Sequence, residues 1–300
     1  MSLERAEGLL AGLGISTGRG GEPATSTERF ADGGWYKWEV AGALDAAAVA
    51  AIDDALRRDG ARLHQATNTV GTMRYLVHEI VDLVNEAAGR GIQLRMAVGP
   101  RGTYDIGGQK FAAGPVAAAS AYRLRGGEQL AQGLEDVLHA VELGVRGFLV
   151  FDEGLLHVLA RLRAAGELPA EVRLKASSNM GAANPAHALL LADAGADSVN
   201  LQRDLDVAML AAVRATTAVA LDLHTDNPRS TGGFVRGYDV PEFVRVAAPV
   251  YLKAGNAAQD FSDDAPTPAV VAGIVRQILL DRQLLERHFP EATASDTPEF

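Results

Sequence analysis

Two side chains that could act together in a reaction stand at the end of one predicted strand, Asp222 and His224. Residues alternate between apolar and other types from Ala218 onward, so both side chains should share a face, their Cα atoms roughly 6.5 Å apart at about 3.3 Å per residue. With Glu153 or Asp226 as a further ligand, the pair could hold a divalent metal ion that activates water for hydrolysis. Without a metal, His224 could act as a general base beside the Asp222 anion.

The segment that follows, TDNPRSTGGF, contains few apolar residues and two adjacent glycines. Gly232 and Gly233 would let backbone amide groups converge on an anion, with the Arg229 guanidinium close by. We interpret this segment as a loop that binds an anionic group of a substrate. A plain turn in solvent is the alternative.

Other predicted strands carry polar residues at every second position, opposite their apolar residues. In a parallel barrel one face of each strand points to the interior, where an unpaired charge costs several kcal/mol. These groups must therefore neutralise one another, bind a ligand or lie at the solvent end. We expect catalytic roles for His224, Asp222, Lys175 and Glu153, and substrate binding by Arg95, Lys253, Asn200, Gln202, Ser177 and Arg229.

The charges suggest two further interpretations. A mixed cluster of Arg95, Lys175 and Lys253 with Glu153, Asp222 and Asp152 could be a purely structural ion-pair network. Alternatively, one of the two lysines could form a Schiff base, since a second cation nearby depresses the pKa of an amine. Ser177 beside Lys175 could be a nucleophile, although no Gly-x-Ser-x-Gly motif surrounds it.

These residues lie on short strands that alternate with helical segments, several of which end in glycine shortly before the next strand. The predicted strands are 35–40, 62–66, 92–98, 147–151, 172–177, 198–202, 218–224 and 250–255. Eight such units predict a closed (β/α)8 barrel of the TIM type, with its active site at the carboxyl ends of the strands. An open doubly wound sheet is the runner-up, but no Gly-x-Gly-x-x-Gly motif follows the first strand.

The chain divides into a barrel and two flanking segments. We expect an N-terminal helix and glycine-rich lead-in over 1–34, a single-domain barrel over 35–290, and a tail over 291–300. An insertion at about 100–129 is the longest connection and is typical of a lid or hairpin.

The amino-acid composition limits the kinds of partner and chemistry that we expect for this protein. A formal charge of −10 disfavours nucleic acid, whose binding depends on clustered Lys and Arg. The absence of cysteine excludes disulfides, thiolate nucleophiles and cysteine-held iron–sulfur clusters. No apolar run spans a membrane and the start lacks a signal peptide, so we expect a soluble, cytoplasmic protein. Assembly into a homo-oligomer is left open.

Four stretches in order resemble the collagenase-like peptidase family, family thirty-two of the peptidases of unknown mechanism. They are EVAGALDAAAVAAIDDALRRDGARLH; GVRGFLVFDEGLL with Asp152 and Gly154; ASSNMGAANPAHALLLADAGADSVNLQRDL with Leu201, Arg203, Asp204 and Leu205; and ALDLH. The resemblance implies a barrel fold and a hydrolase. The chain departs from the family after His224, where relatives commonly continue into glycine and cysteines.

Three functions follow from these observations. The leading hypothesis is a hydrolase of the collagenase-like peptidase type, acting on a small or peptidic substrate with an anionic group. The first alternative is a Schiff-base or metal-assisted lyase or aldolase acting on a small keto acid, and the second is a barrel that binds a partner or metabolite without catalysis. The sequence leaves open whether a divalent metal is bound.

Overall fold

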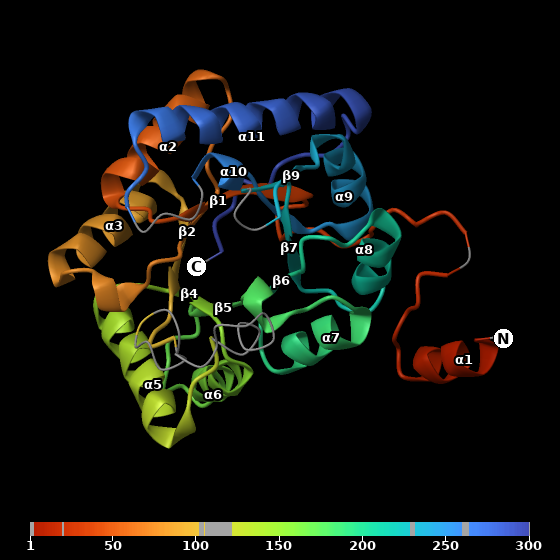
Figure 1. Ribbon diagram of the computed structural model, residues 1–300, viewed down its shortest axis with the longest axis horizontal. Coiled ribbons are helices and arrows are strands. Elements are labelled where there is room, and N and C mark those ends of the chain that lie inside the picture. Colours follow the sequence, from red (N-terminus) through yellow and green to blue (C-terminus); the bar gives the residue numbers. More distant parts are fainter. Residues whose placement is uncertain are drawn as a thin grey trace.

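Eight parallel strands close into a barrel, and helices form the layer around it (Figure 1). The computed structural model describes residues 3–19, 21–101, 105, 122–228, 232–259 and 264–299. Around the barrel the strands pair in the order β1-β10-β7-β6-β5-β4-β3-β2. Their bounds are β1 Tyr36–Gly42, β2 Gln65–Asn68, β3 Gln93–Ala97, β4 Gly147–Val150, β5 Arg173–Ala176, β6 Ser198–Asn200, β7 Ala220–His224 and β10 Val250–Lys253. The predicted (β/α)8 barrel is confirmed.

The second strand begins later than predicted, at Gln65 instead of residue 62. Strand β2 pairs with β1 so that Gln65 lies opposite Glu39 and Thr67 lies opposite Ala41. The inward side chains of Gln65 and Thr67 both donate hydrogen bonds to the Glu39 carboxylate, at 2.8 and 2.7 Å. This register therefore places two neutral donors around a buried carboxylate.

Several helices begin at a side chain that caps their free amide groups. Asp45, Asn184 and Asp206 accept a backbone N–H at the start of α2, α7 and α8. Asp152, which we expected near the charge cluster, does the same for α6 by accepting from the Leu155 amide at 2.9 Å. The helices are α1 Glu4–Gly12, α2 Ala46–Arg58, α3 Val77–Arg90, α5 Gly126–Glu142, α6 Glu153–Ala164, α7 Pro185–Asp193, α8 Val207–Arg214, α9 Val240–Ala247, α10 Asn256–Gln259 and α11 Pro268–His288.

Alternate side chains of each strand separate an apolar outer layer from a largely polar interior. Trp38, Leu94 and Phe148 belong to the main hydrophobic core. Polar and charged side chains on the opposite parity are almost completely buried; they are Lys37, Glu39, Gln65, Thr67, Gln93, Arg95, Lys175, Asp222 and Lys253. The predicted polar interior is thus present, and its charges must be neutralised inside the barrel.

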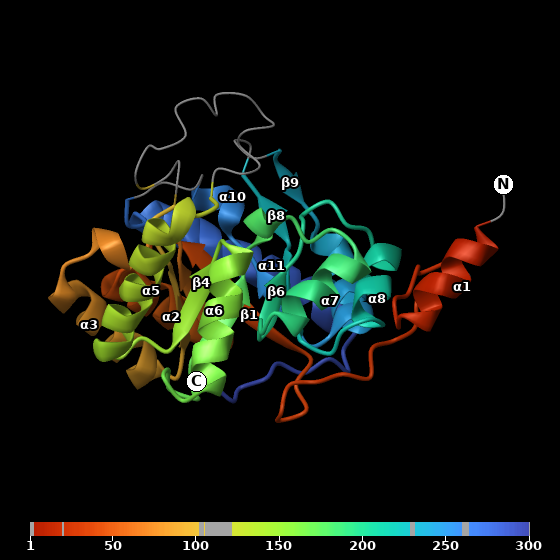
Figure 2. The ribbon, with the colours of Figure 1, turned by 90° about the horizontal axis from the view of Figure 1, so that it is seen from below.

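The C-terminal tail covers the amino-terminal end of the barrel, and Figure 2 shows the chain end on the lower side of the molecule, below the strands. The Ser295 amide donates to the Tyr36 carbonyl, and Lys37 Nζ donates to the Thr297 carbonyl at 2.7 Å. Tyr251 in the barrel interior donates its hydroxyl proton to Glu299 Oε2 at 3.0 Å. The tail is therefore the floor of the barrel.

Helix α1 stands apart from the barrel in Figures 1 and 2, and none of its residues is buried. The lead-in nevertheless reaches the interior, where the Phe30 ring packs edge-on against Tyr251 at 5.3 Å. Of the predicted insertion at about 100–129, residues 102–104 and 106–121 lie outside the described residues. No helix in the described ranges has the length and apolar character needed to cross a membrane.

Replacement of Tyr251 by Phe should lower the free energy of unfolding by about 1 kcal/mol, because the tail and Gln93 each lose a buried hydrogen-bond partner. Urea unfolding measures the change. The matched control is Tyr238→Phe, since Tyr238 is 84% exposed and should leave stability unchanged. Equal effects of the two substitutions would show that the contact between Tyr251 and the tail adds nothing to stability.

Candidate active site

Four charged side chains meet inside the barrel: Glu39, Lys175, Asp222 and Lys253. Lys175 Nζ lies 2.6 Å from Glu39 Oε2 and is ion-paired with Asp222, while Lys253 Nζ lies 3.2 Å from Glu39 Oε1. None of the four is more than 3% exposed. Two amino groups and two carboxyl groups thus meet inside the barrel, almost completely shielded from bulk water, and can neutralise each other.

Glu39 is the member of this cluster that we did not predict. It lies on β1, where Lys37 and Glu39 alternate with Tyr36, Trp38 and Val40. That alternation is the signal that would have placed it in the interior. Glu39 takes the position in the cluster that we assigned to Glu153.

The pKa values of the cluster are strongly perturbed. Burial alone would raise the pKa of Glu39, but Lys175 and Lys253 more than reverse this and hold it well below its ordinary value. Burial raises the pKa of Asp222 to about 6. Burial also lowers the pKa of Lys253, and the neighbouring Lys175 lowers it further, although Glu39 opposes both effects.

A cavity of about 270 Å³ opens at the carboxyl ends of the strands, above this cluster. Its lining residues are Ala41, Thr69, Arg101, Tyr122, Leu149, Phe151, Ser177, Ser178, Asn179, Asn200, Arg203, His224 and Lys253. Four predicted site residues, Lys253, His224, Asn200 and Ser177, therefore do come together. Lys175 and Asp222 are not among the described residues that line it. Lys175 is connected to Lys253, which does line it, by the Glu39 carboxylate that both lysines contact.

His224 presents a hydrogen-bond donor to this cavity. Asn256 Nδ2 lies 3.4 Å from His224 Nδ1 and also faces the carbonyls of Lys253 and Asp226, so it is the donor to the ring. Burial and Lys253 hold the pKa of His224 well below its ordinary value, so the ring is neutral. With Nδ1 accepting, the proton of a neutral imidazole sits on Nε2. Within the described residues, His224 Nε2 has no hydrogen-bond partner.

The predicted Asp222–His224 pair is not formed. Asp222 is engaged with Lys175, and the ring of His224 contacts Asn256 instead. Both side chains point to the interior as predicted, but Asp222 pairs with Lys175 on β5, two strands away. In the register with β10, Asp222 lies opposite Tyr251 and His224 lies opposite Lys253. A carboxylate that oriented His224 as a general base would have to come from elsewhere.

Glu153 lies outside the cluster, contrary to our expectation. It is the first residue of α6 and its carboxylate is paired with Arg123 Nη2 at 2.7 Å. Because Asp152 caps this helix, the chain has left the strand before Glu153. The expected metal set of Asp222, His224 and Glu153 is therefore not assembled, and the described part of the chain contains no other group of three or more His, Cys, Asp or Glu side chains placed to hold a metal ion.

Three more predicted substrate-binding residues do not line the cavity in the described part of the chain. Two of them have hydrogen-bond partners elsewhere. Arg95 points toward the floor, where it donates to the carbonyls of Leu94 at 3.1 Å and Glu299 at 3.5 Å. Gln202 donates to the Ser178 carbonyl at 2.5 Å. Arg229 is outside the described residues.

The segment after His224 forms a two-stranded antiparallel hairpin, β8 Asp226–Asn227 and β9 Phe234–Val235. Gly232 and Gly233 have positive φ angles of 106° and 54°, as expected for a glycine turn. The Gly233 amide donates to the Pro228 carbonyl at 2.9 Å, so it is occupied by the turn itself. The predicted convergence of amide groups on an anion is not formed by Gly233.

Sequence reasoning missed two arginines that line the cavity, Arg101 and Arg203. Each follows the carboxyl end of a strand, which is the signal that could have identified them. Arg101 is held by Asp105 at 2.9 Å and by the Thr69 carbonyl at 2.7 Å. Burial lowers the pKa of Arg203, whose Nη2 lies 3.4 Å from Ser178 Oγ. The ion pair with Asp105 neutralises Arg101, so the positive charge on this wall of the cavity comes from Arg203.

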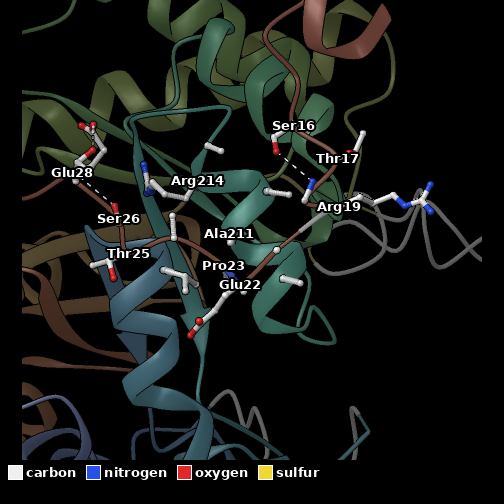
Figure 3. Close-up of a pocket in the computed structure, with 18 residues that line it drawn as sticks. Ser16, Thr17, Arg19, Glu22, Pro23, Thr25, Ser26, Glu28, Ala211 and Arg214 are labelled. Carbon is white, nitrogen blue, oxygen red and sulfur yellow. Dashed lines mark hydrogen bonds between the residues drawn. The ribbon is translucent and has the colours of Figure 1, made fainter. Parts of the chain in front are cut away.

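A larger cleft, about 540 Å³, lies between the lead-in and α8, away from these charges (Figure 3). Two of its buried polar side chains, Ser26 and Arg214, have partners in the protein. Ser26 Oγ accepts from the Glu28 amide and donates to the Ala248 carbonyl, and the buried Arg214 donates to the carbonyls of Ala247 and Thr217. We interpret this cleft as the place where the lead-in packs against the barrel and not as the reaction site.

Comparison with known proteins identifies similar folds. No family model matches the chain, and no curated protein does. Solved structures similar to it include a U32 peptidase, with 17% identity over 83% of this chain and 98% of the other and a TM-score of 0.43. The YdjI aldolase from Escherichia coli K12 shows 13% identity over 96% and 95%, with a TM-score of 0.46. Nitroalkane oxidase from Streptomyces ansochromogenes shows 18% identity over 76% and 67%, with a TM-score of 0.43.

These similarities are too distant to assign a reaction. The similar structures include a peptidase, an aldolase and an oxidase. The barrel itself is established by its strand pairing, and membership in the collagenase-like peptidase family stays a prediction.

Replacement of Glu39 by Gln should lower the free energy of unfolding by about 3–5 kcal/mol, since it leaves two buried lysines with one carboxylate. Urea unfolding at neutral pH measures this loss. Glu142→Gln is the control, because the Glu142 side chain is 78% exposed and should give no measurable change. A loss at Glu39 no larger than the control would mean that the lysines carry no charge in the folded protein.

Proposed function

We propose that this protein is an enzyme of the lyase class that forms a Schiff base between Lys253 and a small oxo acid. The observation that supports it best is the placement of Lys253, a buried amine with a lowered pKa that lines the mouth cavity beside a neutral His224. An amine must lose its proton before it can attack a carbonyl carbon, and a lowered pKa makes more of that form available at a given pH.

The neighbours of Lys253 suit each part of this reaction. The Nζ lone pair forms a bond to the carbonyl carbon, and the displaced electron pair of the C=O bond passes to the oxygen. His224 Nε2–H can donate to that oxygen as negative charge develops on it. The oxygen then takes two protons, one from the attached nitrogen and one from solvent, and departs as water, leaving a protonated carbon–nitrogen double bond.

The cavity also limits the substrate. A volume of about 270 Å³ suits a small molecule, and the positive charge of Arg203 on the wall suits a carboxylate. Asn200 Oδ1 is buried and has no partner in the described part of the chain, so it can accept a hydrogen bond from a substrate hydroxyl. These features favour a small hydroxylated oxo acid.

A hydrolase acting on a small or peptidic substrate with an anionic group is the second candidate. The unpartnered Nε2 of His224 in the cavity is the observation that favours it, because that group could stabilise a tetrahedral intermediate. Ser177 contributes little to this candidate, since its hydroxyl oxygen accepts from the Asn179 amide at 3.2 Å. In this case water, and not Lys253, would be the nucleophile.

Incubation with pyruvate followed by borohydride should add one reduced pyruvate unit to Lys253, located by peptide mapping. Lys253→Arg should abolish the label, because a guanidinium keeps the charge near Glu39 but forms no Schiff base. Lys37→Arg is the matched control and should retain the label, since Lys37 lies at the floor. A label on another lysine would disprove the assignment, and hydrolysis of peptides with no label for a panel of oxo acids would favour the second candidate.

The amount of label on Lys253 should increase with pH. Because the pKa of Lys253 is lowered, the midpoint of this increase should lie below pH 10.5, the ordinary pKa of a lysine. Glu39 raises the pKa of Lys253, so Glu39→Gln should move this rise to still lower pH. Samples equilibrated at each pH and then reduced give the profile. If Glu39→Gln does not fold, Asp222→Asn tests the same direction, and a rise at higher pH in either variant would contradict the proposed charge coupling.

A further inference from the structure

A second cleft lies at the opposite end of the barrel from the mouth. It has a volume of about 480 Å³ and is bordered by the starts of β1 and β2, the end of α2, helix α11 and the C-terminal tail. It adjoins another cleft of about 550 Å³, with which it shares Arg57, Arg62 and Asp296. Nothing in the proposed reaction uses this region.

His64 places a buried hydrogen-bond donor on this cleft. Its Nδ1 accepts from the Trp38 amide at 3.0 Å, and burial lowers its pKa to about 3, so the ring is neutral and carries its proton on Nε2. The residue is only 4% exposed, and in the described ranges Nε2 makes no hydrogen bond. A buried donor that makes no full hydrogen bond is costly and indicates a site for a closer acceptor.

Arg62 lies beside it in a fixed orientation. Its Nη2 donates to the carbonyls of Arg90 at 3.2 Å and Gly91 at 3.1 Å, which anchors the guanidinium. Its Nε is buried and has no hydrogen-bond partner within the described part of the chain. Arg62 thus lines the cleft with an in-plane N–H donor that no protein group in the described ranges accepts.

The carboxylate nearest to Arg62 lies farther away than the carboxylates that pair with the neighbouring arginines. Asp296 Oδ1 lies 3.5 Å from both Arg62 Nη1 and His64 Nε2, and the Asp296 side chain is 72% exposed. The other arginines of the two clefts have carboxylates much closer, at 2.5–2.7 Å; the pairs are Arg57–Asp53, Arg90–Asp54 and Arg282–Glu286. Asp296 thus marks the position of an anion without making full hydrogen bonds to either donor.

We infer that this cleft binds a small oxyanion, a phosphate or carboxylate group, between Arg62 and His64. The oxygens of the anion accept from His64 Nε2–H and from the Arg62 guanidinium at ordinary hydrogen-bond distance, and the anion displaces the Asp296 side chain toward solvent. The site is distinct from the mouth cavity, so its test does not depend on Lys253 chemistry.

Calorimetric titration of the full chain with inorganic phosphate, and separately with acetate, at constant ionic strength tests the inference. Asp296→Asn should tighten binding on the order of tenfold, the change expected for about 1.4 kcal/mol of relieved repulsion. Arg62→Gln should abolish that gain. His64→Asn, which keeps an acceptor for the Trp38 amide but removes Nε2, should weaken binding about tenfold through one lost hydrogen bond to an anion.

Glu142→Gln is the matched control, since it removes one negative charge at an exposed position on α5 and should leave affinity unchanged. Stronger binding of phosphate than of acetate assigns the site to phosphoryl groups, and the reverse assigns it to carboxylates. The inference fails if neither anion binds saturably to Asp296→Asn, if the gain survives Arg62→Gln, or if Glu142→Gln tightens binding equally.

Discussion

The neutralisation of two lysines by two carboxylates inside a closed barrel is the interaction on which the rest of the structure depends. Interior charges have no access to bulk water, so each must meet an opposite charge at hydrogen-bond distance. Glu39 satisfies this condition by contacting Lys175 and Lys253 together, with Gln65 and Thr67 donating to the same carboxylate. The closed ring of strands is what brings these side chains within reach of one another.

The same arrangement divides the interior into levels with different roles. The charge cluster occupies the middle, the cavity with His224 and Asn200 lies at the mouth, and the tail with Glu299 closes the floor. Tyr251 connects the lower two levels, because its hydroxyl contacts Glu299 while Lys175 Nζ lies 5.0 Å from the centre of its ring. Lys253 connects the cluster to the cavity and is the lysine whose charge the reaction would use.

This geometry supports amine chemistry better than hydrolysis by a carboxylate-assisted histidine. Asp222 is committed to Lys175, and His224 is neutral with its proton directed by Asn256 to Nε2. A histidine in that form donates a hydrogen bond and cannot accept a proton at the same nitrogen. In the proposed function His224 therefore polarises a carbonyl group, and the nucleophile must come from Lys253 or from water.

The sequence by itself determined the eight strands and which side chains face the interior, because the alternation of two residues per repeat is a local property of an extended chain. Alternation gives the face of a side chain but neither its height in the barrel nor its partner. Tertiary structure decided that Glu39 joins the cluster, that Glu153 leaves it at the start of α6, and that Arg95 turns to the floor. Those outcomes depend on strand register and on contacts between strands far apart in sequence, which only closure of the barrel fixes.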